Sequence, residues 1–182
     1  MGRPAGVAHG TVTDTDPLIV SALLDPETQA ELDAQRQRLF PSKRLVVGAH
    51  LTLFHALPGE RADEVVAALD ELTARPPIAG RVRAPFALGR GVAYRIEAPG
   101  LDAVHAAIAR RFAGDLTRQD SRRPHHHVTV QNKVDPETAK ATLADLVASH
   151  APYPATVTGL ALWRYRGGPW ESVREFPFRG EG

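Results

Sequence analysis

The sequence predicts an α+β fold of two similar lobes, each a mostly antiparallel sheet with helices on its outer face, around a central cleft. Two observations carry this prediction. The order strand, helix, strand, helix, strand is expected in residues 17–88 and again in residues 91–164. The tetrapeptide His-Leu-Thr-Leu at 50–53 returns 77 residues later as His-Val-Thr-Val at 127–130. Together they indicate an internal duplication, with pseudo-repeats at about 17–90 and 91–178.

The composition is that of one globular domain. The chain has 182 residues, 43% of them hydrophobic, and its 22 Lys and Arg against 21 Asp and Glu give a net charge of +1. We expect a single domain at 17–178 after a flexible tail at 1–16. The charge balance argues against a heavily basic nucleic-acid coat. The absence of cysteine excludes disulfides, a thiolate nucleophile and Cys-based zinc sites.

The apolar runs are too short to cross a bilayer, which takes about 20 residues. The run at 18–24 follows Asp14 and Asp16 rather than a basic stretch, which is not typical of a signal peptide. We therefore expect a cytoplasmic protein without membrane association, and nothing in the pattern requires more than a monomer.

Caps and apolar spacing define the first half, with strands at 17–25, 45–55 and 78–88 and helices at 26–39 and 60–74. The first strand is a short apolar run. Asp25 can cap the first helix, where Pro26 takes a tolerated first-turn position. The second helix places apolar residues on one face: Val65, Ala68, Leu69 and Leu72.

The second half has strands at 91–98, 126–133, 155–165 and 170–178 and helices at 101–113 and 135–149. Gly89-Arg90-Gly91 predicts the turn between strands 78–88 and 91–98. Asp135 can cap the last helix, with Pro136 at its start. A polar, basic loop at 118–124 precedes the second tetrapeptide. The helix at 101–113 also has one apolar face: Val104, Ala107, Ile108 and Phe112.

The repeated tetrapeptide gives each strand one polar and one apolar face. Side chains alternate along a strand, so His50 and Thr52 share one face, and His127 and Thr129 do the same. The residue frequencies predict about 0.1 such tetrapeptides by chance. Two copies in corresponding places therefore favour a functional pair over two ordinary sheet histidines.

Two His-x-Thr pairs in one cleft suit displacement at a phosphodiester. One neutral imidazole can take a proton from the attacking water or hydroxyl, and the other, protonated, can give one to the leaving oxygen. The hydroxyls of Thr52 and Thr129 can donate to the non-bridging phosphate oxygens. This chemistry needs no metal or other cofactor. The two halves are too alike in sequence to say which histidine is the base.

The paired motifs on a duplicated α+β chain resemble the two-histidine phosphoesterase superfamily and, within it, the 2′-5′ RNA ligase-like proteins. The resemblance covers residues 17–178, and the segments 162–170 and 176–178 are similar to the end of bacterial members. It implies a bilobal fold and metal-independent phosphodiesterase activity on 2′,3′-cyclic phosphates or 2′-5′ linkages of RNA or nucleotides, with RNA ligation as the reverse reaction. The matching catalytic positions are His50, Thr52, His127 and Thr129.

Other residues are candidates for substrate binding. Phe54 shares the strand parity of His50 and could stack on a base, although a core position is favoured. Lys133 shares the parity of His127 and could reach a phosphate or lie at a solvated strand end. Tyr165 could line the cleft for a base. Basic pairs precede both motifs and could hold phosphates at the cleft mouth: Lys43 and Arg44, and Arg122 and Arg123.

Two other functions stay open. One is a non-catalytic RNA- or nucleotide-binding module with the same cleft, which turnover of a 2′,3′-cyclic nucleotide would distinguish. The other is a metal-dependent hydrolase using His125-His126-His127, which is disfavoured because the sequence has no cysteine and no His-Glu-x-x-His, so no metal site is predicted. His55, five residues after His50, should face the other side of a regular strand and is interpreted as a packing or strand-end residue.

Overall fold

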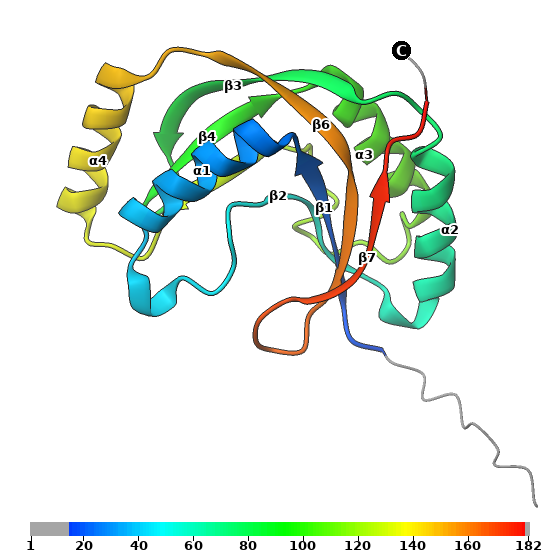
Figure 1. Cartoon of the computed structure of the whole chain (residues 1–182). Coiled ribbons are helices and arrows are strands. Elements are labelled where there is room, and N and C mark those ends of the chain that lie inside the picture. Colours follow the sequence, from blue (N-terminus) through cyan, green and yellow to red (C-terminus); the bar gives the residue numbers. More distant parts are fainter. Residues whose placement is uncertain (1–14, 181–182) are drawn as a thin grey trace, which may run out of the picture.

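The computed structural model describes residues 15–180 as one antiparallel sheet with four α-helices (Figure 1). The α+β class and the antiparallel pairing are confirmed. The strands are β1 (Leu18–Leu24), β2 (Leu51–Leu57), β3 (Ile78–Ala87), β4 (Val92–Glu97), β5 (His127–Gln131), β6 (Tyr153–Arg164) and β7 (Glu171–Pro177). The helices are α1 (Pro26–Leu39), α2 (Ala62–Leu72), α3 (Pro99–Arg111) and α4 (Pro136–Ser149), with short 3₁₀ turns at η1 (Ser42–Arg44) and η2 (Gly59–Arg61).

The long strand β6 organises the sheet. The strand order is β2-β1-β6-β3-β4-β5, and β7 pairs with β6 beyond the end of its contact with β3. Strands β2 and β5 are therefore the two ends of this order, yet they contact each other. The sheet must curl strongly to bring them together, and Figure 1 shows this curvature. Since β2 and β5 carry the two His-x-Thr motifs, the curl is what assembles the site.

The helix starts follow the sequence prediction. The side chain of Asp25 accepts a hydrogen bond from the backbone N–H of Thr28 at 2.9 Å, and Asp135 does the same for Thr138 at 2.9 Å. Each cap satisfies one amide that the helix leaves without a partner. Gly89 adopts a φ of 55°, as the turn between β3 and β4 requires.

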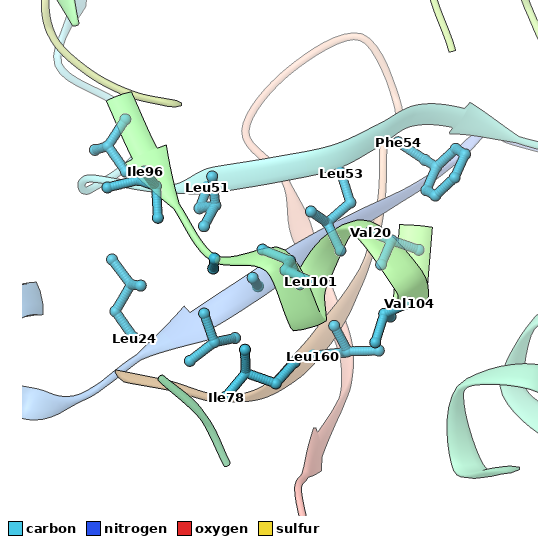
Figure 2. Close-up of a cluster of buried hydrophobic side chains, with 14 of the residues drawn as sticks. Val20, Leu24, Leu51, Leu53, Phe54, Ile78, Ile96, Leu101, Val104 and Leu160 are labelled. Carbon is cyan, nitrogen blue, oxygen red and sulfur yellow. The ribbon is translucent and has the colours of Figure 1, made fainter. Parts of the chain in front are cut away.

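One hydrophobic cluster holds the sheet and helices together. Figure 2 shows Leu51 and Leu53 of β2 with Leu101 and Val104 of α3 and side chains from the neighbouring strands. Leu51, Leu101 and Val104 are fully buried. Burying a side chain of this kind stabilises the fold by about 1.5–3 kcal/mol. The buried apolar side chains of each motif strand thus hold the strand in place, and this fixes the position of the polar side chains on its other face.

The predicted strand at 45–55 is wrong in its first part, since β2 begins only at Leu51. The preceding residues run irregularly, because α1 side chains take up their backbone groups, as described below.

Phe54 does not reach the cleft, so its proposed role in base stacking is wrong. Thr52 pairs with Ser21 of β1, but Phe54 pairs with Val20, so β2 has one extra residue between them. This bulge reverses the side-chain alternation. Phe54 is completely buried among the core residues of Figure 2 and stacks on His105 at a ring distance of 4.4 Å.

The strand predicted at 126–133 ends earlier, at Gln131. Lys133 has a left-handed φ of 60°, and its N–H donates to the side chain of Asn132. Lys133 therefore lies in a turn and does not share strand parity with His127. Its exposed side chain is still a candidate for phosphate binding.

Two further expectations concern the N-terminal tail and the membrane. Of the tail predicted at 1–16, only residues 15 and 16 are among the described residues. Within the described part, no helix is both long and apolar enough to span a membrane.

Two histidines are buried beneath β2. His105 of α3 and His126 are 5% and 7% exposed, and their rings lie 6.2 Å apart. His126 Nε2 is 2.9 Å from a carboxylate oxygen of Asp102. Burial is the main cause that lowers the pKa of both imidazoles, and the charges of neighbouring histidines lower it further, while Asp102 opposes the shift in both.

We predict that the protein loses stability as pH falls below 6.5. Below that pH the unfolded chain binds protons that the buried histidines of the folded chain resist, so acid favours unfolding. Thermal melting between pH 5 and 8 should show a falling Tm, and His105→Phe should flatten the slope. Lys140→Gln, a change at an exposed residue of α4 whose charge does not contribute to the shifts of His105 or His126, is the control. Equal slopes in wild type and His105→Phe would contradict the prediction.

Candidate functional site

The two motif histidines are held in the same way. The Nδ1 of His50 lies 2.7 Å from the carbonyl oxygen of Gly48, and the Nδ1 of His127 lies 2.6 Å from that of His125. In each motif the partner is the carbonyl two residues earlier. A carbonyl can only accept, so Nδ1 must carry the hydrogen. Each neutral ring therefore has its lone pair on Nε2, which is the tautomer that can accept a proton.

Each threonine lies two residues after its histidine, Thr52 on β2 and Thr129 on β5. Thr52 and Thr129 are half-buried, like His50 and His127. Thr129 pairs with the buried Ala93 of β4. The structure therefore brings together the four predicted catalytic residues on β2, on β5 and on the residue that leads into β2.

Helix α1 fixes the chain that leads into His50. Asp33 accepts a hydrogen bond from the N–H of Ala49 at 2.6 Å. Gln29 donates to the carbonyl of Ala49 at 2.8 Å and to the Asp33 carboxylate at 3.0 Å. Both backbone groups of the residue before His50 are thus bonded by one helix. Because these contacts replace a strand partner, the segment can leave the sheet without unpaired backbone groups.

Arg36, on the next turn of α1, connects the two motifs. Its Nε donates to the carbonyl of Val47 at 3.0 Å, and its Nη1 donates to the carbonyl of Thr129 at 2.5 Å. The side chain is buried, with the whole residue 6% exposed, and its guanidinium lies 4.2 Å from the ring centre of Phe40. A single buried cation therefore holds the approach to His50 against the strand of His127.

The importance of these α1 residues could have been inferred from their spacing in the sequence. Gln29, Asp33 and Arg36 recur at helical intervals on the same side as the fully buried Leu32. A polar stripe next to a buried apolar residue indicates a helix face whose side chains form hydrogen bonds with other protein groups rather than with water.

The pKa of His50 is lowered. Burial is the main cause, because it disfavours the charged ring, and the positive charges of Arg36, His55 and His127 act in the same direction. The hydrogen bond to Gly48 opposes them. The charge of His127, when protonated, acts on His50, which agrees with the contact between β2 and β5.

Aromatic side chains flank both histidines. The ring of Trp170 is 4.7 Å from that of His50, and the ring of Phe86 on β3 is 6.1 Å from that of His127. Trp163, on β6, is 6.1 Å from Trp170 and donates its Nε1–H to the hydroxyl of Ser21 at 2.8 Å. Sequence reasoning did not single out Phe86, because its place depends on strand register: Phe86 pairs with Ala93 of β4, which pairs with Thr129 of β5.

The basic loop before the second motif is fastened to β2. The buried carboxylate of Asp120 accepts the N–H groups of His55 and Ala56 at 2.9–3.1 Å and lies 3.1 Å from His55 Nδ1. This bond set holds the pKa of Asp120 below its usual value, although burial alone would raise it. The loop that carries Arg122 and Arg123 is thereby tied next to the strand of His50.

The remaining candidates lie at exposed positions. Lys43 and Arg44 are in η1, and Tyr165, which is 43% exposed, follows β6. The structure gives none of these side chains a contact with His50 or His127.

The three consecutive histidines point apart. His126 is buried and bonded to Asp102, the half-buried His127 is bonded to the carbonyl of His125, and the side chain of His125 is exposed. Among residues 15–180, no three His, Cys, Asp or Glu side chains are grouped so that they could hold a metal ion.

Replacing Arg36 tests its role as the link between the motifs. We predict that Arg36→Met lowers the free energy of unfolding by about 1–3 kcal/mol, because two carbonyls lose their donor. Loss of the nearby charge should also raise the pKa of His50, measured by NMR titration of its ring. Arg38→Met, at an exposed position on the same helix, is the control. An unchanged His50 titration in Arg36→Met would show that Arg36 does not act on this ring.

Comparison with known proteins agrees with this geometry. The chain resembles solved structures of TT0787 from Thermus thermophilus (22% identity, TM-score 0.60, covering 91% of this chain and 100% of that one) and of a phosphoesterase (17%, 0.61, 91% and 99%). It also resembles E. coli LigT complexed with 3′-AMP (15%, 0.58, 91% and 99%). These likenesses show the fold. No curated protein matches. Residues 24–169 match the model of the 2′-5′ RNA ligase superfamily, and the chain belongs to this family.

Proposed function

We propose that the protein is a metal-independent phosphodiesterase that acts on 2′,3′-cyclic phosphate or 2′-5′ phosphodiester bonds of RNA or nucleotides. The observation that carries the proposal is that both histidines are held by the same kind of hydrogen bond. Each donates from Nδ1 to the carbonyl two residues before it, which leaves both Nε2 atoms for proton transfer. A pair of histidines with only a structural role would not need matched tautomers.

The proposed mechanism uses the two rings in turn. A phosphate held between the strands accepts hydrogen bonds from Thr52 and Thr129. One neutral Nε2 removes the proton from the attacking water or ribose hydroxyl, and the other ring, protonated, delivers a proton to the leaving oxygen. After the reaction the two rings have exchanged protonation states. The same site therefore supports the reverse reaction, RNA ligation, when the termini are bound together.

The aromatic rings near the histidines suit a nucleotide. Trp170 beside His50 and Phe86 beside His127 offer faces on which a base could stack, a contact worth about 1–3 kcal/mol. E. coli LigT has been solved with 3′-AMP, ATP and NADP⁺, which supports a nucleotide ligand in this fold. Arg122 and Arg123, on the loop tied to β2, would meet the phosphates of a longer RNA.

The matched histidine geometry also supports the proposal that the two halves of the chain are duplicated lobes. The long strand β6 would then serve both lobes, pairing with β3 through its first part and with β1 and β7 through the rest.

Replacing either histidine should remove catalysis. We predict that His50→Ala and His127→Ala each lower kcat on nucleoside 2′,3′-cyclic monophosphates by about 10²–10⁴-fold, the range that general acid–base groups contribute. Thr52→Val and Thr129→Val should lower kcat by about 10²-fold through loss of a donor to the phosphate. Hydrolysis is measured in EDTA by separating the 2′- and 3′-phosphate products.

His125→Ala is the matched control. It removes a neighbouring imidazole but keeps the carbonyl that orients His127, so its turnover should equal that of wild type. Near-native activity in a folded His50→Ala or His127→Ala variant would overturn the mechanism. No wild-type turnover, with binding intact, would leave a nucleotide-binding module.

The pH–rate profile tests the two-histidine requirement separately. Activity needs one neutral and one protonated imidazole, so kcat/KM should be bell-shaped. Because burial lowers the pKa of His50, the limb that His50 sets should lie below pH 6.5, the ordinary pKa of a histidine. Arg36→Met should move this limb to higher pH, since it removes a charge that disfavours protonation. A flat profile between pH 5 and 8 would contradict two titrating rings.

A further inference from the structure

A cavity of about 880 Å³ opens on the opposite side of the sheet from the histidine motifs. It is bounded by α1, by the end of α4 and by the start of β6. Its deepest wall includes Tyr94 of β4, which is 1% exposed. Arg95, the next residue, pairs with His127. Neighbouring residues in a strand face opposite ways, so the cavity and the motif cleft are separate sites.

Aromatic rings form one wall of the cavity. The ring of His150 lies 5.1 Å from that of Tyr94 and 6.0 Å from that of Tyr153. The Tyr94 hydroxyl donates to Gln35 at 2.8 Å, and the Gln35 amide donates to Glu31 at 2.7 Å. This hydrogen-bond chain orients the Glu31 carboxylate at the cavity.

Two polar atoms of this wall have no partner in the protein. The hydroxyl of Tyr153 and the Nε2 of His150 are both shielded from solvent and make no hydrogen bond. A buried polar group without a partner costs about 1–3 kcal/mol. Both residues line the cavity, so a bound molecule is a candidate partner for these two atoms.

The charges around the cavity are mostly negative. Asp25, Glu27 and Glu31 line it against a single lining cation, Arg38. Burial raises the pKa of Tyr153 to about 12, and the nearby charges of Glu31 and Asp25 raise it in the same direction. The electrostatic field in the cavity therefore disfavours anions such as nucleotides and favours a positively charged ligand.

We propose that this cavity binds a small organic amine, an aliphatic diamine or triamine whose ammonium groups pair with Glu31 and Glu27 and lie against the aromatic rings. An ammonium group over a tyrosine face gains cation–π attraction in addition to its pairing with a carboxylate. The cavity volume is in the range of small-molecule sites, about 300–1,000 Å³. A bare metal ion does not fit, since no three metal-ligating side chains are grouped anywhere in residues 15–180.

Calorimetric titration of the full chain with putrescine and with spermidine at low salt tests the proposal. Saturable 1:1 binding is expected, with no equivalent binding of Mg²⁺ at the same concentration. Glu31→Gln should weaken binding at least tenfold, although its amide oxygen can still accept from Gln35. Tyr153→Phe should also weaken it. Arg38→Met should tighten binding severalfold, because it removes the opposing charge.

Glu137→Gln is the matched control, since it makes the same charge change on α4 outside the cavity. It should bind like wild type. NMR should show the ring signals of His150 shifting with spermidine while those of His50 and His127 stay unchanged. Equal weakening by Glu31→Gln and Glu137→Gln, equivalent binding of Mg²⁺, or shifts confined to the motif histidines would each overturn the proposal. None of these outcomes depends on phosphodiesterase activity.

Discussion

The buried guanidinium of Arg36 is the interaction on which the site depends. A charge removed from water must be paired or fully hydrogen-bonded, or it destabilises the fold. Here it is satisfied by two backbone carbonyls, one just before His50 and one inside the strand of His127. Because leaving this cation unpaired would cost free energy, it keeps the segment before His50 close to strand β5. The two motifs cannot separate without exposing the charge or stripping it of acceptors.

The same helix determines the direction of the first histidine. Asp33 and Gln29 bond both backbone groups of Ala49, and the carbonyl of Gly48 then orients His50. At the second motif the carbonyl of His125 orients His127 in the same way, while the buried His126 is bonded to the exposed carboxylate of Asp102. Each motif ring is thus aimed by backbone. Backbone carbonyls do not titrate, so whenever either ring is neutral its hydrogen stays on Nδ1 and its lone pair on Nε2.

The two faces of the sheet provide opposite electrostatic environments. Near His50, the buried guanidinium of Arg36 supplies a positive charge that helps to lower the pKa of the ring. On the helix face, Asp25, Glu27 and Glu31 border the cavity and suit an ammonium group. Tyr94 and Arg95 show how close the two environments are, because adjacent residues of β4 belong to different faces. If both proposals hold, the curled sheet presents two separate binding surfaces that favour ligands of opposite charge.

The sequence by itself determined the α+β class, the helix caps and the two His-x-Thr pairs, because these depend on local periodicity and on a short repeated pattern. Tertiary structure decided the rest. The bulge that buries Phe54 comes from the register of β2 against β1, and the early end of β5 comes from the turn at Lys133. The partners of Arg36 lie 11 and 93 residues away along the chain. Such contacts arise from how the sheet curls, which no local pattern encodes.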